Sequence, residues 1–303
     1  MPVAIVPEGL DSLRADVGAS RLFGIARSRV EQAAENGQLL LDGQPISKSH
    51  RLTPGMMLEV EIEEPRTVVV SPRLVEGMGI IYDDADLVVV DKPAGIAAHP
   101  SLGWDGPSVV EHLAAAGFEV CTSGPPERKG IVSRLDVGTS GLMVVAKSEM
   151  AYTALKTAFS ARKVHKVYHA LVQGYPTPEE GTIDAPIAYA KTDEWKMAVD
   201  PTGREAITHY RVLEIVSKAS LVTIGLETGR THQIRVHMAA IRHPLVGDIL
   251  YGGDPVLAKE TGLIRQWLHA VELGFNHPRS GKMVTFTSVY PADLQQALDH
   301  LRR

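Results

Sequence analysis

Residues 130–146 read Gly-Ile-Val-Ser-Arg-Leu-Asp-Val-Gly-Thr-Ser-Gly-Leu-Met-Val-Val-Ala, and they place one arginine and one carboxylate, Arg134 and Asp136, between two apolar runs. The apolar runs, residues 131–132 and 142–146, predict buried strands, and the turn formers between them predict a loop. Loops held by a rigid framework often carry catalytic groups. An Asx-turn, in which Asp136 caps the backbone and Arg134 lies along apolar surface, explains this segment equally well at this point.

The composition is that of a globular protein: of 303 residues, 44% are hydrophobic and 22% are charged, enough for one large domain and one small domain. The first ten residues lack a basic region followed by a long apolar core, and no stretch approaches the roughly 18 uncharged apolar residues of a membrane span. We therefore expect a cytoplasmic protein with no membrane partner. Cys121 is the only cysteine, which excludes an internal disulfide and a thiolate metal cluster.

The formal charge of −5 argues against a generally basic nucleic-acid binder, but two runs contain cations and no acidic residue. Residues 228–247 carry Arg230, Arg235 and Arg242, and residues 156–169 carry Arg162, Lys163 and Lys166. Each run alone is typical of a solvated face. Two such runs in one chain are also typical of a cleft that binds phosphates.

The pattern predicts a small unit at residues 1–64, a linker at residues 65–77 and a larger domain at residues 78–303. In the small unit we expect helices at residues 11–17 and 26–35, strands at 39–41 and 57–62, and a two-residue hairpin turn at Asp42-Gly43. The linker contains Pro72 and Gly77 and shows no sustained periodicity.

In the larger domain, short strands outnumber helices. We expect strands at residues 87–90, 167–173, 208–215 and 220–227, and helices at 108–115, 149–161 and 231–241, the last capped by Thr231. Many strands with few regular crossover helices predict an α+β fold with a mixed, largely antiparallel sheet.

Two further positions are candidates for chemistry. If a helix begins at Thr231, Arg235 lies one turn in, near a helix N-terminus that favours anions, and can hold a carboxylate or a phosphate. His232 and His237 are five residues apart and do not share a helix face, so we expect no metal site there. Strand alternation places Tyr168 on one face with Ala170 and Val172, where it either packs in the core or stacks on a base and transfers a proton.

The sequence has no Walker loop, no dinucleotide-binding glycine turn, no nucleophile elbow and no metal-ligand cluster. An enzyme without a cofactor or a metal would have to use a carboxylate, an arginine and a tyrosine. That set suits nucleophilic attack on an electrophilic sugar carbon.

The chain closely resembles the RluA family of pseudouridine synthases, and its RluD branch most. The resemblance rests on Ser-Arg-Leu-Asp-Val-Gly-Thr-Ser-Gly at 133–141, Tyr168, Gly-Arg-Thr-His-Gln-Ile-Arg-Val-His at 229–237 and His-Pro-Leu-Val-Gly-Asp at 243–248. It runs in order from about residue 80 to the C-terminus and includes Asp-Lys-Pro-Ala-Gly at 91–95. Residues 1–64 resemble the α/β RNA-binding domain shared with small-subunit ribosomal protein S-four. Ser133 departs from the family, which usually has histidine there.

The resemblance implies a pseudouridine-synthase fold that isomerises specific uridines to pseudouridine without cofactor or metal. It implies a monomer that acts on large-subunit (23S) ribosomal RNA, free or within an assembling ribosomal particle, and not on DNA. Asp136 corresponds to the family's catalytic aspartate, which attacks C1′ or assists elimination to a glycal, and Arg235 to the arginine that pairs with it. Tyr168 corresponds to the tyrosine that stacks on the flipped base, and Arg134 to the arginine that fills the space this base leaves.

Further RNA contacts are expected at Arg230, His232 and Gln233 in the matched stretch. In the small unit, six acidic and six basic residues among residues 1–58 cancel, so an RNA-binding face requires clustering. The candidates are Arg21, Arg27, Arg29, Lys48 and Arg51, for which a solvated face is an equally good interpretation.

Other functions remain possible at this stage. One alternative is a non-catalytic RNA-binding factor for ribosome assembly, and another is a family member that acts on tRNA. A glycosidase or nucleosidase would need a second carboxylic acid as proton donor, and no paired carboxylate is evident.

Overall fold

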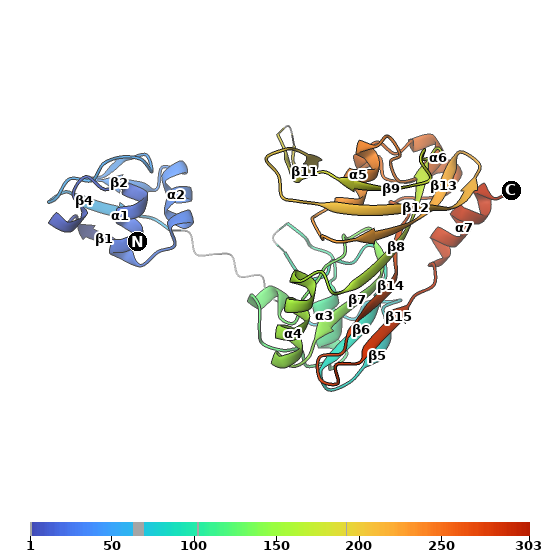
Figure 1. Cartoon of the computed structure of the whole chain (residues 1–303). Helices are drawn as coiled ribbons and strands as arrows, with labels where there is room; N and C mark the ends of the chain where they lie inside the picture. Colours follow the sequence, from blue (N-terminus) through green and yellow to red (C-terminus); the bar gives the residue numbers. More distant parts are fainter. Residues whose placement is uncertain (1, 63–69, 102, 192) are drawn as a thin grey trace. The chain divides into compact units, whose positions relative to one another are not determined.

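The computed structural model describes residues 2–62, 70–101, 103–191 and 193–303 (Figure 1). The chain divides into two compact units, Met1–Thr67 and Val68–Arg303. Within the described residues, no helix is long and apolar enough to cross a membrane.

The first unit packs two helices, α1 (Ala15–Phe23) and α2 (Arg27–Glu35), with a four-stranded sheet. The sheet order is β1 (Val3–Ile5), β4 (Met57–Val60), β2 (Leu39–Leu41) and β3 (Gln44–Pro45). The predicted Asp42-Gly43 turn joins β2 to β3, and both residues have positive φ, 49° and 75°, as a type I′ turn requires. The helix expected at 11–17 starts later, because a 3₁₀ turn, η1 (Glu8–Leu10), and positive φ at Ser12 precede it.

Among the described residues of the first unit, one carboxylate is buried, that of Asp16. Arg14 and Arg27 both donate to it, with the shortest contact 2.7 Å from Arg27 Nη2 to Oδ2. The hydrogen bond from Arg14, against the cost of burial, lowers the pKa of Asp16 to about 2. Two of the six basic residues among residues 1–58 therefore neutralise an internal acid.

The second unit is built on one nine-stranded sheet. Its order is β5 (Gly79–Asp83), β6 (Leu87–Lys92), β7 (Ser140–Ala146), β14 (Leu268–Asn276), β8 (His165–Gln173), β13 (Ala219–Leu226), β12 (Ile207–Val216) and β9 (Glu180–Asp184), and β15 (Met283–Thr287) also pairs with β14. Only β7 and β14 pair in parallel among these described strands. The predicted α+β class with a mixed, largely antiparallel sheet is confirmed. A separate hairpin joins β10 (Ile187–Ala190) to β11 (Asp193–Val199).

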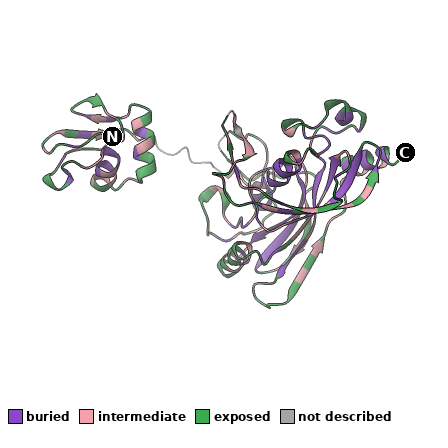
Figure 2. Cartoon of the chain, turned by 45° about the horizontal axis from the view of Figure 1, so that its top comes forward, coloured by how far each residue is buried: buried purple, intermediate pink, exposed green. Residues whose placement is uncertain are grey.

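Helices α3 (Val109–Ala115) and α4 (Glu149–Ser160) pack on opposite faces of the β6–β7 pair. Val144 of β7 lies in the cluster with α4, and Val145 lies in the cluster with α3. Both faces of these strands are therefore buried (Figure 2), which explains their continuous apolar sequence. Ser108 and Ser148 cap the two helices, which were predicted at 108–115 and 149–161. The remaining helices are α5 (Gln233–Ala240), α6 (Pro255–Glu260) and α7 (Ala292–Leu301), with 3₁₀ turns η2 (Pro126–Arg128) and η3 (Ile249–Tyr251).

The predicted strand at residues 131–132 needs correction, and the predicted linker lies only partly within the described residues. Residues 131–132 are buried but form no strand, because Ile131 makes only an isolated bridge to Val145. Part of the predicted linker, residues 65–69, lies outside the described residues. Further along that stretch, the Val75 backbone N–H donates to His112 Nδ1 of α3 over 2.9 Å, and Val75 is buried against the same helix.

Candidate active site

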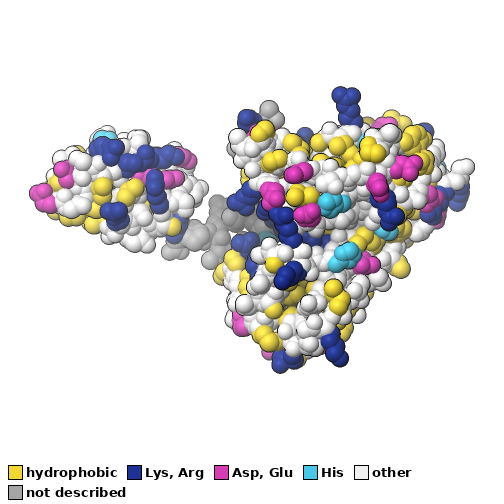
Figure 3. Space-filling model, viewed as in Figure 1, with side chains coloured by type: hydrophobic (Ala, Val, Ile, Leu, Met, Phe, Trp, Pro, Cys, Tyr) yellow, Lys and Arg dark blue, Asp and Glu magenta, His cyan; other side chains and the backbone are white. Residues whose placement is uncertain are grey.

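A cleft of about 600 Å³ opens in the second unit. Its walls come from residues 131–136 before β7, from the end of α4, from β8 and from residues 226–235 between β13 and α5. Lys and Arg side chains gather in the middle of this unit's front face (Figure 3), and cations of both acid-free runs line the cleft. The phosphate-binding interpretation of those runs therefore gains a structural basis.

All seven cleft residues expected from the sequence lie together, although they come from positions up to 101 residues apart between Arg134 and Arg235. They are Arg134, Asp136, Tyr168, Arg230, His232, Gln233 and Arg235. Ser133, where the chain departs from the RluA pattern, also lines the cleft.

Arg235, which lines the cleft, pairs with two carboxylates, those of Asp136 and Asp248. We refer to these three residues as the cleft cluster. Arg235 donates from Nε and Nη2 to the two oxygens of Asp248 over 2.7 and 2.9 Å. Its Nη1 lies 3.6 Å from Oδ2 of Asp136. The side chain of Asp136 is 21% exposed, against 1% for Asp248, so Asp136 is the carboxylate that a ligand can reach.

Arg235 stays charged despite its burial. Burial alone would lower the pKa of Arg235, but the hydrogen bonds and negative charge of Asp248, with the charge of Asp136, raise it above the ordinary value. The Tyr251 ring covers the guanidinium at 4.7 Å from the ring centroid. A permanent cation therefore faces Asp136.

The loop that carries Asp136 is held by its backbone. The Thr139 N–H donates to the Asp136 carbonyl over 3.0 Å, and the Gly95 N–H donates to the Val137 carbonyl over 2.8 Å. Within the described part of the chain, no backbone N–H donates to the Asp136 carboxylate, so the Asx-turn alternative is wrong. The Asp136 carboxylate is therefore not used to hold the loop together, and it faces the cleft.

Lys92 of β6 also holds the loop that carries Asp136. It is fully buried, and its ammonium group donates to the carbonyls of Ile96 over 2.8 Å and of Val137 over 3.4 Å. Burial lowers the pKa of Lys92 to about 7, although the nearby Asp136 charge opposes that shift. The Asp-Lys-Pro-Ala-Gly stretch at 91–95 thus supports the Asp136 loop.

Tyr168 and Lys166 lie on the same face of β8, two residues apart, and both line the cleft. Burial, and then the charge of Asp136, raises the pKa of the Tyr168 hydroxyl, which is therefore neutral. Burial lowers the pKa of Lys166 to about 8. The alternation in β8 correctly predicts the facing of Tyr168.

Arg134 does not pair with its neighbour Asp136; it donates a short hydrogen bond to the Thr231 hydroxyl. Thr231 was expected to cap a helix over residues 231–241, but α5 begins at Gln233 and has no side-chain cap. His232 precedes it with φ of 55°, a left-handed conformation that the sequence pattern does not reveal. Its Nδ1 lies 2.7 Å from the Tyr251 hydroxyl, and burial lowers the pKa of His232.

Gln233 is buried and uses its amide inside the protein. Its oxygen accepts from the Thr228 hydroxyl and the Arg230 N–H, and its nitrogen donates to the Ile207 carbonyl and the Thr208 hydroxyl. These bonds hold the turn before α5. Arg230 lies on the cleft wall and donates from Nε to the Glu205 carbonyl over 2.9 Å.

The basic residues of the first unit that we expect to contact RNA differ in their partners within the protein. Arg27 pairs with buried Asp16, Lys48 pairs with Glu35 at 2.7 Å, and Arg51 donates to the Ser12 carbonyl over 2.9 Å. Arg21 and Arg29 lie on α1 and α2. The role of all five in RNA binding stays a prediction.

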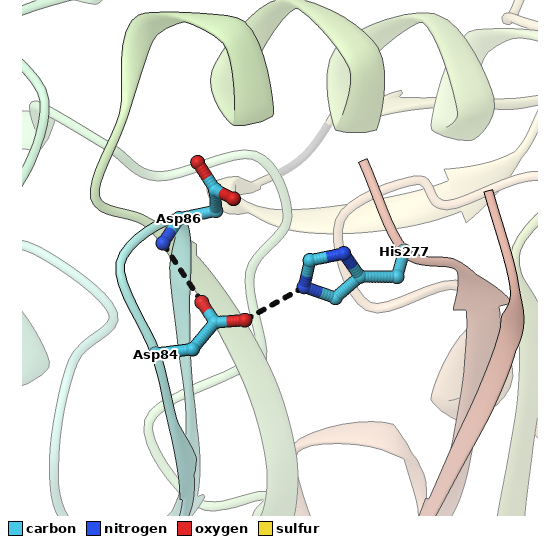
Figure 4. A group of neighbouring side chains, drawn as sticks. All are labelled: Asp84, Asp86 and His277. Atoms are coloured by element: carbon cyan, nitrogen blue, oxygen red, sulfur yellow. Dashed lines mark hydrogen bonds and ion pairs between the residues drawn. The ribbon is translucent and has the colours of Figure 1, made fainter. Parts of the chain in front are cut away.

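Another acidic cluster, away from the cleft, has the right atoms for a cation. We name Asp84, Asp86, His277 and Arg279 the hairpin cluster, and Figure 4 shows Asp84 between the Asp86 backbone nitrogen and the His277 ring. Asp84 accepts from the N–H groups of Asp86 and Leu87, and Asp86 binds Arg279 through two contacts of 2.6 and 2.8 Å. These protein donors already occupy the oxygens, and they tie the β5–β6 hairpin to the β14–β15 hairpin.

Comparison with known proteins decides the family. The model of the family described as RNA pseudouridylate synthase matches residues 86–240, more than half of the chain. The chain belongs to this family. The resemblance to RluA-type enzymes is thereby confirmed, and the protein is an RNA pseudouridine synthase.

Relatives of this pseudouridine synthase match over nearly the whole chain. An uncharacterised RNA pseudouridine synthase of Mycobacterium bovis is 56% identical over 98% of this chain and 97% of its own. A ribosomal large subunit pseudouridine synthase D of Xanthomonas campestris is 39% identical over 99% of this chain and 92% of its own. The solved structure of human RNA pseudouridylate synthase domain containing 4 is 26% identical and has a TM-score of 0.59, with 74% of this chain and 93% of that chain covered.

Some residues at the cleft have no role that the sequence alone indicates. Lys92 and Asp248 stood within matched stretches, but only the fold shows that one supports the Asp136 loop and the other binds Arg235. Arg128 and Lys156 add charge to the cleft wall. Co-variation between two positions would be the signal that reveals such a contact, because neither the periodicity of the sequence nor the spacing of the residues links the two members of a pair.

Proposed function

We propose that this pseudouridine synthase isomerises uridines in large-subunit ribosomal RNA, with Asp136 as the nucleophile. The observation that carries the proposal is the accessible Asp136 carboxylate 3.6 Å from Arg235, in a cleft also lined by Tyr168 and Arg134. The ribosomal substrate is supported by relatives named ribosomal large subunit pseudouridine synthase D, such as that of Xanthomonas campestris.

The reaction exchanges one glycosidic bond for another. As the Asp136 carboxylate adds to C1′, the bond from C1′ to N1 breaks and its electron pair leaves with uracil. The detached base rotates, C5 bonds to C1′ as the aspartyl ester breaks, C5 loses its proton and N1 gains one. In the alternative route Asp136 assists elimination to a glycal, and the base adds back through C5. Both routes leave the atom count unchanged and need no cofactor.

The surrounding groups suit these steps. The fixed positive charge of Arg235 faces the Asp136 carboxylate in a half-buried site, which suits nucleophilic attack by that carboxylate. Tyr168, neutral and half-buried beside Asp136, stacks on the base and moves a proton. Arg134, once released from Thr231, fills the space of the flipped base, which offsets part of an unstacking cost of a few kcal/mol.

RNA binding is divided between the two units in this proposal. Along the cleft, Arg128, Lys156, Lys166 and Arg230 bind the phosphates, with His232 beside them, while Gln233 acts by holding the wall in shape. The first unit, as an S-four-like RNA-binding domain, adds contacts from its basic residues Arg21, Arg27, Arg29, Lys48 and Arg51.

The test is to map pseudouridines in ribosomal RNA, by carbodiimide adducts and primer extension, in cells that lack the gene. We expect at least one pseudouridine of the large subunit to disappear, wild-type protein to restore it, and Asp136→Asn to fail. In vitro, tritium release from C5-labelled uridine in unmodified ribosomal RNA should fall by at least about 10³-fold in Asp136→Asn.

Three outcomes would contradict the proposal in different ways. Equal tritium release by wild type and Asp136→Asn would exclude Asp136 as the nucleophile. If a pseudouridine is lost from tRNA alone, the substrate is tRNA and not ribosomal RNA. No loss from any RNA would favour a non-catalytic assembly factor.

A further inference from the structure

We propose that Asp248 is a positioning residue for the reaction. It fixes the orientation of Arg235 and supplies a second negative charge that remains when Asp136 reacts. This inference rests on the proposed role of Asp136 as the nucleophile.

The geometry assigns different tasks to the nitrogens of one guanidinium. Nε and Nη2 of Arg235 bind Asp248 in a two-pronged contact of 2.7 and 2.9 Å, which fixes the plane of the group. Nη1 is left to face Asp136, at 3.6 Å. The arginine is thus fully bonded to the buried acid and only loosely paired with the accessible one.

The backbone around Asp248 is locked, which explains the matched stretch at 243–248. The Asp248 N–H donates to the Leu245 carbonyl, and its own carbonyl accepts from the N–H groups of Tyr251 and Gly253. Gly247 has φ of 82°, and a Cβ there would lie 2.0 Å from the Arg265 carbonyl oxygen. Only glycine fits that position, so the carboxylate of the next residue is delivered at a fixed place.

Charge balance gives the physical reason for a second acid. While Asp136 is ionised, the buried Arg235 has two anions beside it. When Asp136 becomes an ester at C1′ its charge is lost, and a buried cation without a partner is strongly unfavourable. Asp248 keeps Arg235 neutralised at that stage. It also prevents Arg235 from turning fully onto Asp136, which would stabilise the starting state more than the transition state.

The segment after Asp248 extends this support. The Tyr251 ring lies over Arg235, and its hydroxyl lies 2.7 Å from His232 Nδ1. The Met197 N–H of β11 donates to the same hydroxyl over 3.0 Å. Residues 248–251 therefore hold two cleft residues at once.

The experiment compares full-length variants in single-turnover tritium release and in RNA binding. In Asp248→Asn we expect turnover to fall by about 10²-fold while RNA affinity stays within about threefold, because the reacting pair is misplaced but the phosphate contacts remain. Asp86→Asn is the matched control, since Asp86 is equally buried and also binds an arginine, Arg279, through two contacts. It should lower the melting temperature without changing turnover.

A double-mutant cycle separates positioning from general stability. If Asp248 acts through Arg235, then Arg235→Ala and the double variant Arg235→Ala/Asp248→Asn should turn over at rates within about threefold of each other. The double variant removes both buried charges, which proteins often tolerate, so its turnover can be measured even where a single variant leaves one buried charge unpaired and does not fold.

Wild-type turnover in folded Asp248→Asn, with Asp136→Asn inactive, would overturn the role of Asp248 and leave the proposed function intact. A further large loss in the double variant relative to Arg235→Ala would also overturn it. Activity in Asp136→Asn would instead remove the proposed function on which the inference stands.

Discussion

The hairpin cluster and the cleft cluster each contain two aspartates and one arginine, and they are built in opposite ways. In the hairpin cluster both carboxylates are covered by donors: Asp84 accepts from two backbone N–H groups, the Tyr82 hydroxyl and the His277 ring. In the cleft cluster Asp248 is covered in the same manner, but Arg235 is the only side-chain partner of the Asp136 carboxylate within the described residues.

The difference shows how a structural carboxylate is separated from the carboxylate that we propose as the nucleophile. A carboxylate whose two oxygens both accept hydrogen bonds contributes to stability, and those bonds make its lone pairs less available for nucleophilic attack. Asp136 lacks those bonds and keeps a cation at 3.6 Å, which is far enough to leave its oxygens available. If Asp136 is the nucleophile, as proposed, the reactive carboxylate is the one that accepts the fewest hydrogen bonds.

Replacing the arginine of each cluster should give the largest difference in turnover between the two clusters. Arg235→Ala is expected to reduce single-turnover tritium release by about 10²-fold with little change in RNA affinity, because Arg235 acts on Asp136 rather than on phosphate. Arg279→Ala should leave turnover unchanged and lower stability. Unchanged turnover with weaker RNA binding in Arg235→Ala would show that Arg235 holds phosphate instead.

The pH dependence of stability should separate the two clusters further. Hydrogen bonds outweigh the effect of burial and lower the pKa of Asp84 from 3.8 to about 2. Because the folded pKa lies below the unfolded one, this stabilisation is complete above about pH 4 and is lost as the pH falls through 2. Asp84→Asn should therefore cost about 2 kcal/mol at pH 7 and progressively less from pH 4 to pH 2.

Urea unfolding of wild type and Asp84→Asn across this pH range measures the effect, with Asp136→Asn as the control. The control should change the free energy of unfolding by less than about 0.5 kcal/mol. A gap between wild type and Asp84→Asn that does not depend on pH would show that the bonds of Asp84 stabilise its neutral form equally well.

The smallest expected effect concerns the first unit, whose Asp16 group with Arg14 and Arg27 is covered like the hairpin cluster. Deleting residues 1–64 should weaken RNA affinity by about tenfold and leave single-turnover chemistry within about twofold, because the cleft cluster lies wholly in the second unit. Filter binding and tritium release would measure the two quantities. Unchanged affinity would count against an RNA-binding first unit.

Much of the local structure could be predicted from the sequence because its causes are local. The Asp42-Gly43 turn follows from residues that tolerate positive φ, and α3 and α4 follow from their serine caps. The start of α5 could not be predicted, because it depends on the left-handed conformation of His232 and on the bond from Arg134 to Thr231, two residues 97 positions apart.

The candidate site shows the same limit. Asp136, Tyr168 and Arg235 are predicted together because each stands in a recognisable stretch of sequence, and the structure places them in one cleft. The partnership of Arg235 with Asp248 was not found, since two charged residues 13 positions apart give no signal of contact. Residues 131–132 were assigned to a strand because apolar character predicts burial, which is correct, but it does not predict pairing.

The placement of β14 has a consequence for the timing of activity during synthesis. This strand lies near the C-terminus of the chain, yet it stands between β7, which follows Asp136, and β8, which carries Tyr168. Until β14 has been made, the two halves of the sheet have no common strand and the cleft residues have no fixed spacing. A nascent chain therefore acquires the spacing of its cleft residues only after β14 has been synthesised.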